Sequence, residues 1–223
     1  MAVPSRSDRL ERFAPLAGTV AVVFFVIPFL LFEVAGDPPG DDATGEEILA
    51  YLRDDRASIL IGLWMFFLGL VFFLWFLGSL RATFFRVEGG VGQVATIAYS
   101  AGVGTVLLMA ATLAPELSSV IAVEENENLS PQAAEALWVL DTGFFIGATF
   151  FLAVFFAASA AIVLRTGLLP RWFGIVTAIL AVAGLIPFIA WAVLLFAMPL
   201  WLIGVSLWLF LRPGPAEAAP ESA

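Results

Sequence analysis

Carboxylates are the side chains with which this sequence could do chemistry. Five of them stand where long apolar runs begin or end: Glu33, Asp54, Asp55, Glu116 and Asp141. Carboxylates gathered at one level concentrate cations, and a carboxylate removed from water has a raised pKa and can carry a proton. The competing interpretation is a set of hydrated helix ends that Arg53 or Arg56 partly neutralises. We therefore predict a ring of outer carboxylates, with cation binding and simple hydration as its two alternative roles.

Residue types that are absent exclude most other chemistry. All ten basic residues are Arg, and the chain contains no Lys, His or Cys. The absence of these residues excludes haem or zinc ligation by His, Schiff-base chemistry on Lys, a Ser/His dyad and thiol redox chemistry. We expect no catalytic residue, no cofactor and no metal site, and hence a protein that is not an enzyme.

The composition indicates a protein whose solvent is the lipid bilayer. Of the 223 residues, 61% are hydrophobic and only 13% are charged, and the mean hydropathy is +1.01. An ordinary soluble domain is far less apolar. We expect the bilayer as partner and no nucleic acid, while a protein partner or a homo-oligomer stays open.

Uncharged runs predict an all-α bundle of six transmembrane helices, because about 20 apolar residues cross a bilayer. The last run has roughly twice that length, and we divide it at Gly184 to Pro187, since proline disfavours helix in the residue before it. The predicted spans are approximately 13–33, 57–80, 92–115, 142–164, 168–186 and 188–211. They form one domain, 1–212, and residues 213–223 are predicted to be a disordered cytoplasmic tail.

The distribution of charge predicts the orientation. Eight of the ten Arg residues lie before span one, between spans two and three, between spans four and five, or after span six. Arg is retained on the cytoplasmic side, so both termini are predicted to be cytoplasmic. Fourteen of the 19 acids lie at or beyond the opposite ends. The expected location is the cytoplasmic membrane, with multiple passes and acidic loops outside.

Both outer segments carry helix-start signals. Thr44 and Glu47 have the spacing of a capping box. Ser130 is a suitable N-cap and Pro131 suits the first helical position. We therefore predict that helices two and four extend beyond the outer face.

Two further interpretations stay open. The basic residues before span one, followed by Val34-Ala35-Gly36, also fit a cleaved secretory signal, which would leave five helices. At an offset of 84 residues, Phe66-Phe67-Leu68 matches Phe150-Phe151-Leu152, which is consistent either with an internal duplication or with chance in an apolar sequence.

Leu169-Pro170-Arg171-Trp172-Phe173-Gly174, at the start of the fifth span, provides a family resemblance. With Ala183-Gly184 behind it, this motif resembles a group of uncharacterised six-helix integral membrane proteins of bacteria, many of them actinobacterial. The resemblance covers roughly Arg12 to Arg212. It implies the fold and the location, and it assigns no functional residue.

These observations favour a non-catalytic integral membrane protein that acts through its bundle or its partners. The alternative is a small transporter or channel-like protein with an acidic outer vestibule. A polar cavity leading from Asp141 toward Tyr99 and Ser100 would favour transport, whereas an apolar bundle without such a cavity would favour the first interpretation.

Overall fold

The computed structural model describes residues 13–35, 38–40, 42–125 and 129–211, without the side chains of 29–35 and 124–125. Within these ranges the chain is helical and contains no strand. The elements are η1 (Ala14–Leu16), α2 (Ala17–Ala35), α3 (Gly45–Asp54), α4 (Arg56–Glu88), α5 (Gln93–Glu125), α6 (Pro131–Thr166), α7 (Arg171–Ala183), α8 (Pro187–Ala192), η2 (Val193–Ala197) and α9 (Met198–Leu211). The all-α prediction is confirmed for this part of the chain, and the tail from 213 lies outside it.

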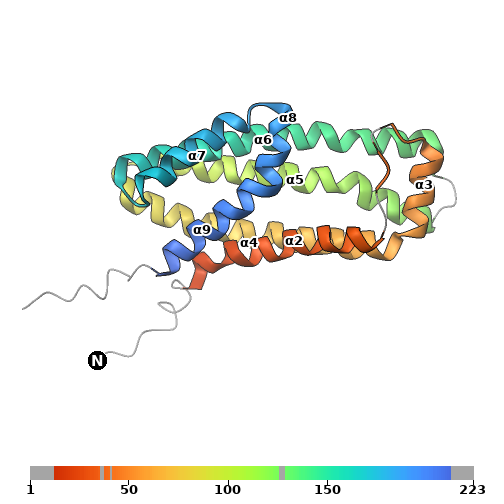
Figure 1. Cartoon of the computed structure of the whole chain (residues 1–223), viewed down its shortest axis with the longest axis horizontal. Helices are drawn as coiled ribbons and strands as arrows, with labels where there is room; N and C mark the ends of the chain where they lie inside the picture. The colour runs from red at the N-terminus through yellow and green to blue at the C-terminus, as the bar shows by residue number, and fades with distance from the viewer. Residues whose placement is uncertain (1–12, 36–37, 41, 126–128, 212–223) are drawn as a thin grey trace, which may run out of the picture.

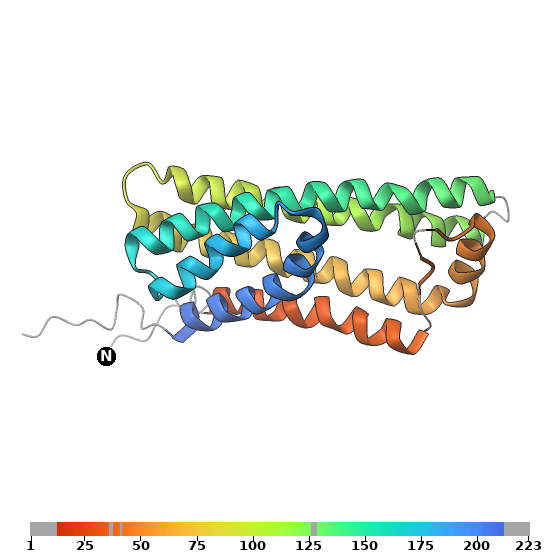
Figure 2. The ribbon, with the colours of Figure 1, turned by 45° about the horizontal axis from the view of Figure 1, so that its top comes forward.

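Three long helices, α4, α5 and α6, lie side by side along the length of the molecule, and α2 packs beside α4 (Figures 1 and 2). Four helical segments are long and apolar enough to cross a membrane: Arg56–Glu88, Gln93–Val123, Pro131–Thr166 and Pro187–Leu211. The described part of the first helix, Ala14–Pro28, and Arg171–Ala183 are shorter apolar helices. These lengths and compositions fit a multi-pass membrane protein.

The two ends of the bundle differ in charge. One end, here called the arginine end, carries Arg81, Arg86, Arg165 and Arg171, all exposed. At this end α4 turns into α5 through Gly89, Gly90 and Gly92, which adopt φ values of 58 to 69° that other residues rarely tolerate. The Glu88 carboxylate accepts hydrogen bonds from the amides of Val94 (2.9 Å) and Ala95 (2.7 Å) and thereby caps α5.

The opposite end is closed by α3, and we call it the α3 end (Figure 1). The sequence analysis predicted that helix two begins near the Thr44 capping box and extends beyond the outer face into span 57–80. Instead the chain bends at Asp55, where φ is −106° and ψ is 14°. The bend lets α3 lie across the bundle and bury Ile48, Leu49 and Leu52 against α5 and α6. We call α3 and the cluster beneath it the α3 cap.

The third helix also extends further than expected. The prediction ended the span at Pro115, but α5 continues through this residue to Glu125. Proline removes one helical hydrogen bond without ending the helix here. The Ser119 hydroxyl donates to the Pro115 carbonyl at 2.8 Å, so the turn after the proline is held by a side chain. Glu116 therefore lies within a helix and not at its end.

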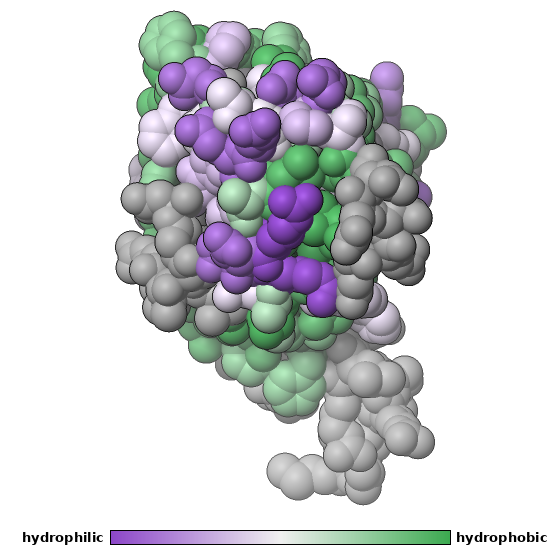
Figure 3. Space-filling model, turned by 90° about the vertical axis from the view of Figure 1, so that its right-hand side faces the viewer, coloured by the Kyte–Doolittle hydropathy of each residue, from purple (hydrophilic) through white to green (hydrophobic). Residues whose placement is uncertain are grey.

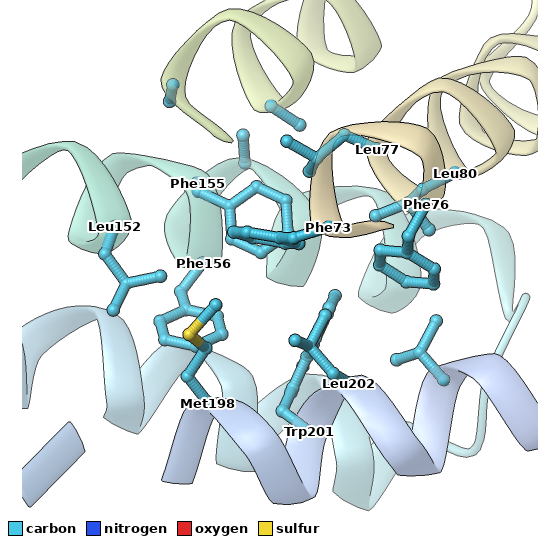
Figure 4. Packing of buried hydrophobic residues seen from close by; sticks show 14 of the residues in the cluster. Phe73, Phe76, Leu77, Leu80, Leu152, Phe155, Phe156, Met198, Trp201 and Leu202 are labelled. Atoms are coloured by element: carbon cyan, nitrogen blue, oxygen red, sulfur yellow. The ribbon is translucent and has the colours of Figure 1, made fainter. Parts of the chain in front are cut away.

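Aromatic side chains fill the middle of the bundle (Figure 4). This aromatic core consists of fully buried Phe73, Phe76, Phe155 and Phe156, together with Trp201, which is 4% exposed. The Phe73 and Phe155 rings meet edge to face at 6.4 Å, and the Phe155 and Trp201 rings do so at 5.3 Å. Since α4, α6 and α9 each contribute rings, the aromatic core joins all three helices.

Helix α7 is too short to cross a bilayer. Its 13 residues span about 20 Å, whereas the hydrocarbon layer is about 30 Å thick. A Cβ placed on Gly184, at its end, would lie 3.5 Å from the Ala153 Cβ. Ala153 is midway between Asp141 and Arg165 on α6, about 18 Å from each. The hairpin formed by α7, α8, η2 and α9 therefore reaches only halfway along α6.

The returning limb of this hairpin crosses the bundle obliquely (Figure 1). Its π-helical turn, Val193–Ala197, includes a hydrogen bond from the Met198 amide to the Val193 carbonyl. The indole of Trp201 donates to the Thr177 hydroxyl at 2.9 Å, and the indole of Trp208 donates to the Leu168 carbonyl at 3.1 Å. These bonds tie α9 to α7 and to the arginine end. The apolar run of 40 residues is thus used for a bent hairpin, and two full crossings in this region stay a prediction.

Candidate functional site

The predicted carboxylate ring is assembled only in part. Asp55 and Glu116 both lie close enough to Tyr51 to act on its ionisation, and Asp141 interacts electrostatically with Glu116. Asp55, Glu116 and Asp141 are half-buried. Asp54 is exposed at the end of α3 and is not drawn into this group. The Glu33 side chain lies outside the described residues.

Tyr51, which the sequence analysis overlooked, stands at the centre of this carboxylate group. Its ring is 8% exposed and meets the Trp138 ring edge to face at 6.1 Å. Burial, followed by the charges of Glu116 and Asp55, raises the pKa of Tyr51 from 10 to about 12. The signal was present in the sequence, because Tyr51 follows Ile48 and precedes Leu52 on the apolar stripe of α3.

Asp141 stands where α6 passes from the α3 cap to the bundle. Its carboxylate accepts a hydrogen bond from the Thr142 hydroxyl at 3.0 Å. Asp141 and Arg56 each interact with at least one other group of the protein. Helices α5 and α6 therefore each place an acid, Glu116 and Asp141, near this level, and α3 adds the phenol of Tyr51.

The position of α3 over these groups is fixed by hydrogen bonds at its first turn. The Gly45 amide donates to the Glu135 carboxylate of α6 at 2.7 Å. Gly45 has to be glycine, because a Cβ there would collide with the backbone of Pro131. The predicted capping box is confirmed: the Glu47 amide donates to the Thr44 hydroxyl, and the Thr44 amide donates to the Glu47 carboxylate at 2.8 Å. The Thr44 hydroxyl also donates to the Glu47 carboxylate at 2.8 Å, and the two hydrogen bonds that this carboxylate accepts from Thr44 lower the pKa of Glu47.

The second predicted helix start is also confirmed. Ser130 is the N-cap of α6 and its hydroxyl accepts from the Ala133 amide at 3.2 Å, with Pro131 at the first helical position. Hydrophilic residues cover the α3 end, and an apolar area shows among them (Figure 3). The exposed charged residues here include Glu46, Glu47, Arg53, Asp54 and Glu135. The α3 end therefore has a hydrated surface over a partly buried group of acids.

This arrangement can attract cations, but it does not form a ligand set for a metal. Within the described ranges, no group of three or more His, Cys, Asp or Glu side chains is placed to hold a metal ion. The acids are held apart on different helices around a phenol whose pKa is high, so Tyr51 stays neutral at physiological pH. The chemistry available to the group is electrostatic attraction and hydrogen bonding.

Among the cavities that the described residues line, two lie elsewhere in the bundle. One, of about 20 Å³, lies between α2, α4, α5, the π turn and the start of α9. The other, of about 390 Å³, lies at the arginine end and is lined by the glycine turn after α4 and by Arg165. Neither is lined by Asp141, Tyr99 or Ser100. Tyr99 lies with its ring 5.5 Å from the Arg81 guanidinium, and Ser100 is exposed.

Comparisons with protein-family models, curated proteins and solved structures find no match to this chain. The family resemblance carried by residues 169–174 therefore stays a prediction.

Proposed function

We propose that this chain is a non-catalytic multi-pass protein of a bacterial cytoplasmic membrane, acting through its lipid-facing and outer surfaces on other membrane components. One observation supports this most: the aromatic core occupies the middle of the bundle. Phe73, Phe155 and Phe156 are 0% exposed and their rings pack against one another and Trp201. A solute path needs polar groups or water at such a point, and a block of packed rings provides neither.

In this proposal the α3 end faces outward and the arginine end faces the cytoplasm, as the positive-inside rule requires. The six-span prediction stays open, since Pro187–Leu211 is long and apolar enough to cross. Because α7 is short and the returning limb runs obliquely, we propose a variant of it: four full crossings, by α2, α4, α5 and α6, and one hairpin that enters from the cytoplasmic side and returns. Both counts place both termini in the cytoplasm. The alternative of a cleaved first segment is disfavoured because Ala21 and Phe25 belong to the core of the bundle.

A second candidate function is cation or proton transport. The observation that favours it is the half-buried Glu116, which interacts electrostatically with Asp141 near the neutral Tyr51. Intramembrane carboxylates mark ion pathways in many transporters. The acids lie at the α3 end, however, and the aromatic core separates them from the arginine end.

Flux across liposomes distinguishes the two proposals. The purified protein is reconstituted with a pH-sensitive dye inside, and a proton or K⁺ gradient is imposed. We expect proton and K⁺ leakage at the rate of protein-free liposomes. Faster flux that Glu116→Gln abolishes, and that the exposed-site variant Glu135→Gln leaves unchanged, would overturn the non-transport proposal in favour of the second candidate.

A further inference from the structure

The cavity at the arginine end lies between the glycine turn (89–92) and the last turns of α6, which run beside each other in Figure 2. Its volume is about 390 Å³. Sites for small molecules have volumes of about 300–1,000 Å³. The side chains that line it most directly are those of Glu88, Val91, Gln93, Ile162, Arg165 and Thr166. The cavity therefore has room for the polar part of a larger molecule, with both charged and apolar groups on its walls.

Arg165 provides the positive charge of this cavity. Its side chain is exposed, and within the described ranges no hydrogen bond or ion pair engages its guanidinium. A guanidinium with free donors binds phosphate oxygens through two parallel hydrogen bonds. An anion that enters the cavity would thus meet a cation that no described group of the protein already neutralises.

Glu88 is the acid on the lining, but its charge is already used. One carboxylate oxygen accepts from the Val94 amide at 2.9 Å and the other accepts from the Ala95 amide at 2.7 Å. The positive end of the α5 dipole offsets this charge. Glu88 therefore leaves Arg165 able to bind an anion, while its proximity disfavours an anion with two or more charges. A phosphodiester, with its single negative charge, fits this balance.

The glycine turn adds uncharged donors to the same cavity. A Cβ placed on Gly89 or Gly90 would meet nothing within 4 Å, so the backbone is open there. The amides of Gly90 and Val91 donate to no other group of the described chain. Backbone amides in turns are frequent partners of phosphate oxygens. Arg165 and the turn can thus serve one phosphate from two sides.

Apolar side chains at the cavity favour a lipid over a soluble phosphate. Val91 lies on its wall and is 86% exposed, and Leu164, next to Arg165, is 43% exposed. In the proposed orientation this end of the bundle lies among the headgroups of the cytoplasmic leaflet. Basic pockets between transmembrane helices on that side bind anionic headgroups. The exposed apolar groups would then contact the glycerol and the first methylenes of the same lipid.

We propose that this cavity binds the headgroup of phosphatidylglycerol, with its phosphodiester on the Arg165 guanidinium and the amides of the glycine turn. The inference rests on the proposed membrane location. It identifies one lipid class, and one place on the bundle, through which the protein would interact with its membrane.

Native mass spectrometry of the full chain tests the site. The protein, in a mild detergent, is mixed with equimolar phosphatidylglycerol, phosphatidylethanolamine and phosphatidylcholine that carry the same acyl chains. We expect the phosphatidylglycerol adduct to exceed each of the others about fivefold, the gain from one Arg beside an anionic headgroup. Arg165→Gln should remove this excess. Arg86→Gln is the matched control, because Arg86 is exposed at the same end but does not line the cavity.

A second variant repels the lipid without removing Arg165. Val91→Glu places a carboxylate on the cavity wall at a position that is 86% exposed, so the fold should tolerate it. This variant should also remove the excess of phosphatidylglycerol. It replaces Arg165→Gln in the test if that variant does not fold, as judged by gel filtration and thermal unfolding.

Four results would overturn the proposal. They are equal adducts of the three lipids, an excess that survives both cavity variants, an equal loss in Arg86→Gln, and displacement of the lipid by millimolar inorganic phosphate but not by acetate of the same ionic strength. The third would indicate diffuse attraction to the arginine end, and the fourth a site for soluble phosphate. Failure of the membrane location would differ from all four: the chain would stay monodisperse without detergent and would not float with phosphatidylglycerol vesicles in a density gradient.

Discussion

The aromatic core and the α3 cap are both hydrophobic clusters, but different forces position them. In the aromatic core, rings from α4, α6 and α9 pack on one another, and few polar groups contribute. In the α3 cap, a capping box starts α3, and the close approach of Gly45 to Pro131 and its hydrogen bond to Glu135 hold Ile48, Leu49 and Leu52 over the bundle. Leu113 of α5 packs against both clusters. We therefore expect the aromatic core to be rigid and the α3 cap to be able to loosen independently of it.

Removing a ring from the aromatic core should have the largest effect. Phe155→Ala leaves a cavity next to Trp201 and Phe73, which neighbouring rings cannot close. We expect the free energy of unfolding to fall by about 3–5 kcal/mol. Unfolding by SDS in mixed micelles measures it. Val154→Ala, at a position 46% exposed, is the control and should cost far less. Equal losses in the two variants would show that the rings are not a rigid core.

Gly45→Ala should loosen the cap and leave the bundle intact. The added Cβ collides with the Pro131 backbone, so α3 must move away and the Gly45 amide loses Glu135. We expect amide exchange in α3 to accelerate about tenfold or more, with little change in the middle of α4 and α6. Ala50→Ser, on the exposed side of α3, is the matched control. Accelerated exchange throughout the bundle would mean that cap and core unfold as one unit.

Tyr51 should make the stability of the α3 cap depend on pH in the alkaline range. Its folded pKa of about 12 exceeds the usual value of 10, so its stabilising contribution is complete below pH 10 and is lost as the pH rises toward 12. The chain has two tyrosines, and Tyr99→Phe leaves Tyr51 as the single one. Absorbance at 295 nm should then titrate near 12. A midpoint near 10 would mean that water reaches the phenol and that the cap does not bury it.

Replacing Glu47 should have the smallest effect on the α3 cap. In contrast to Tyr51, Glu47 loses its stabilising contribution at acid pH. Its pKa is lowered from the usual 4.5 by hydrogen bonds from Thr44, so its contribution is present above that value and is lost as the pH falls. Glu47→Gln should modestly speed exchange of the first-turn amides of α3 at pH 7, relative to the wild type. The difference should vanish at acid pH, once the Glu47 carboxylate is protonated. A difference that persists there would assign the effect to something other than the charge.

Local signals in the sequence predicted local structure correctly. Thr44 with Glu47, and Ser130 with Pro131, each involve residues within one turn, so the starts of α3 and α6 followed from spacing alone. The proximity of Glu116 and Asp141 also followed from counting residues, because helices rise by a constant distance per residue. Their place on the outer side stays a prediction.

Tertiary contacts determined what the sequence did not indicate. The bend at Asp55, the place of Tyr51 and the half-length hairpin depend on contacts between residues far apart in the chain, such as Gly184 with Ala153 and Trp201 with Thr177. Counting apolar residues cannot distinguish two crossings from one bent hairpin of the same length. The 84-residue repeat stays a prediction for a similar reason, since apolar matches alone do not establish a duplication.

Labelling of single cysteines most directly tests the account of a hydrated outer end above a dry core. The chain has no native Cys, so Asp141→Cys, Glu135→Cys and Ser159→Cys each provide one thiol for a membrane-impermeant maleimide added to intact cells. We predict fast reaction at position 135, slower reaction at half-buried position 141, and none at position 159, where Ser is 0% exposed. Labelling at 159 would reveal a water path through the core. Absence of labelling at both 135 and 141 until the cells are broken would place the α3 end in the cytoplasm, and either result would contradict the account.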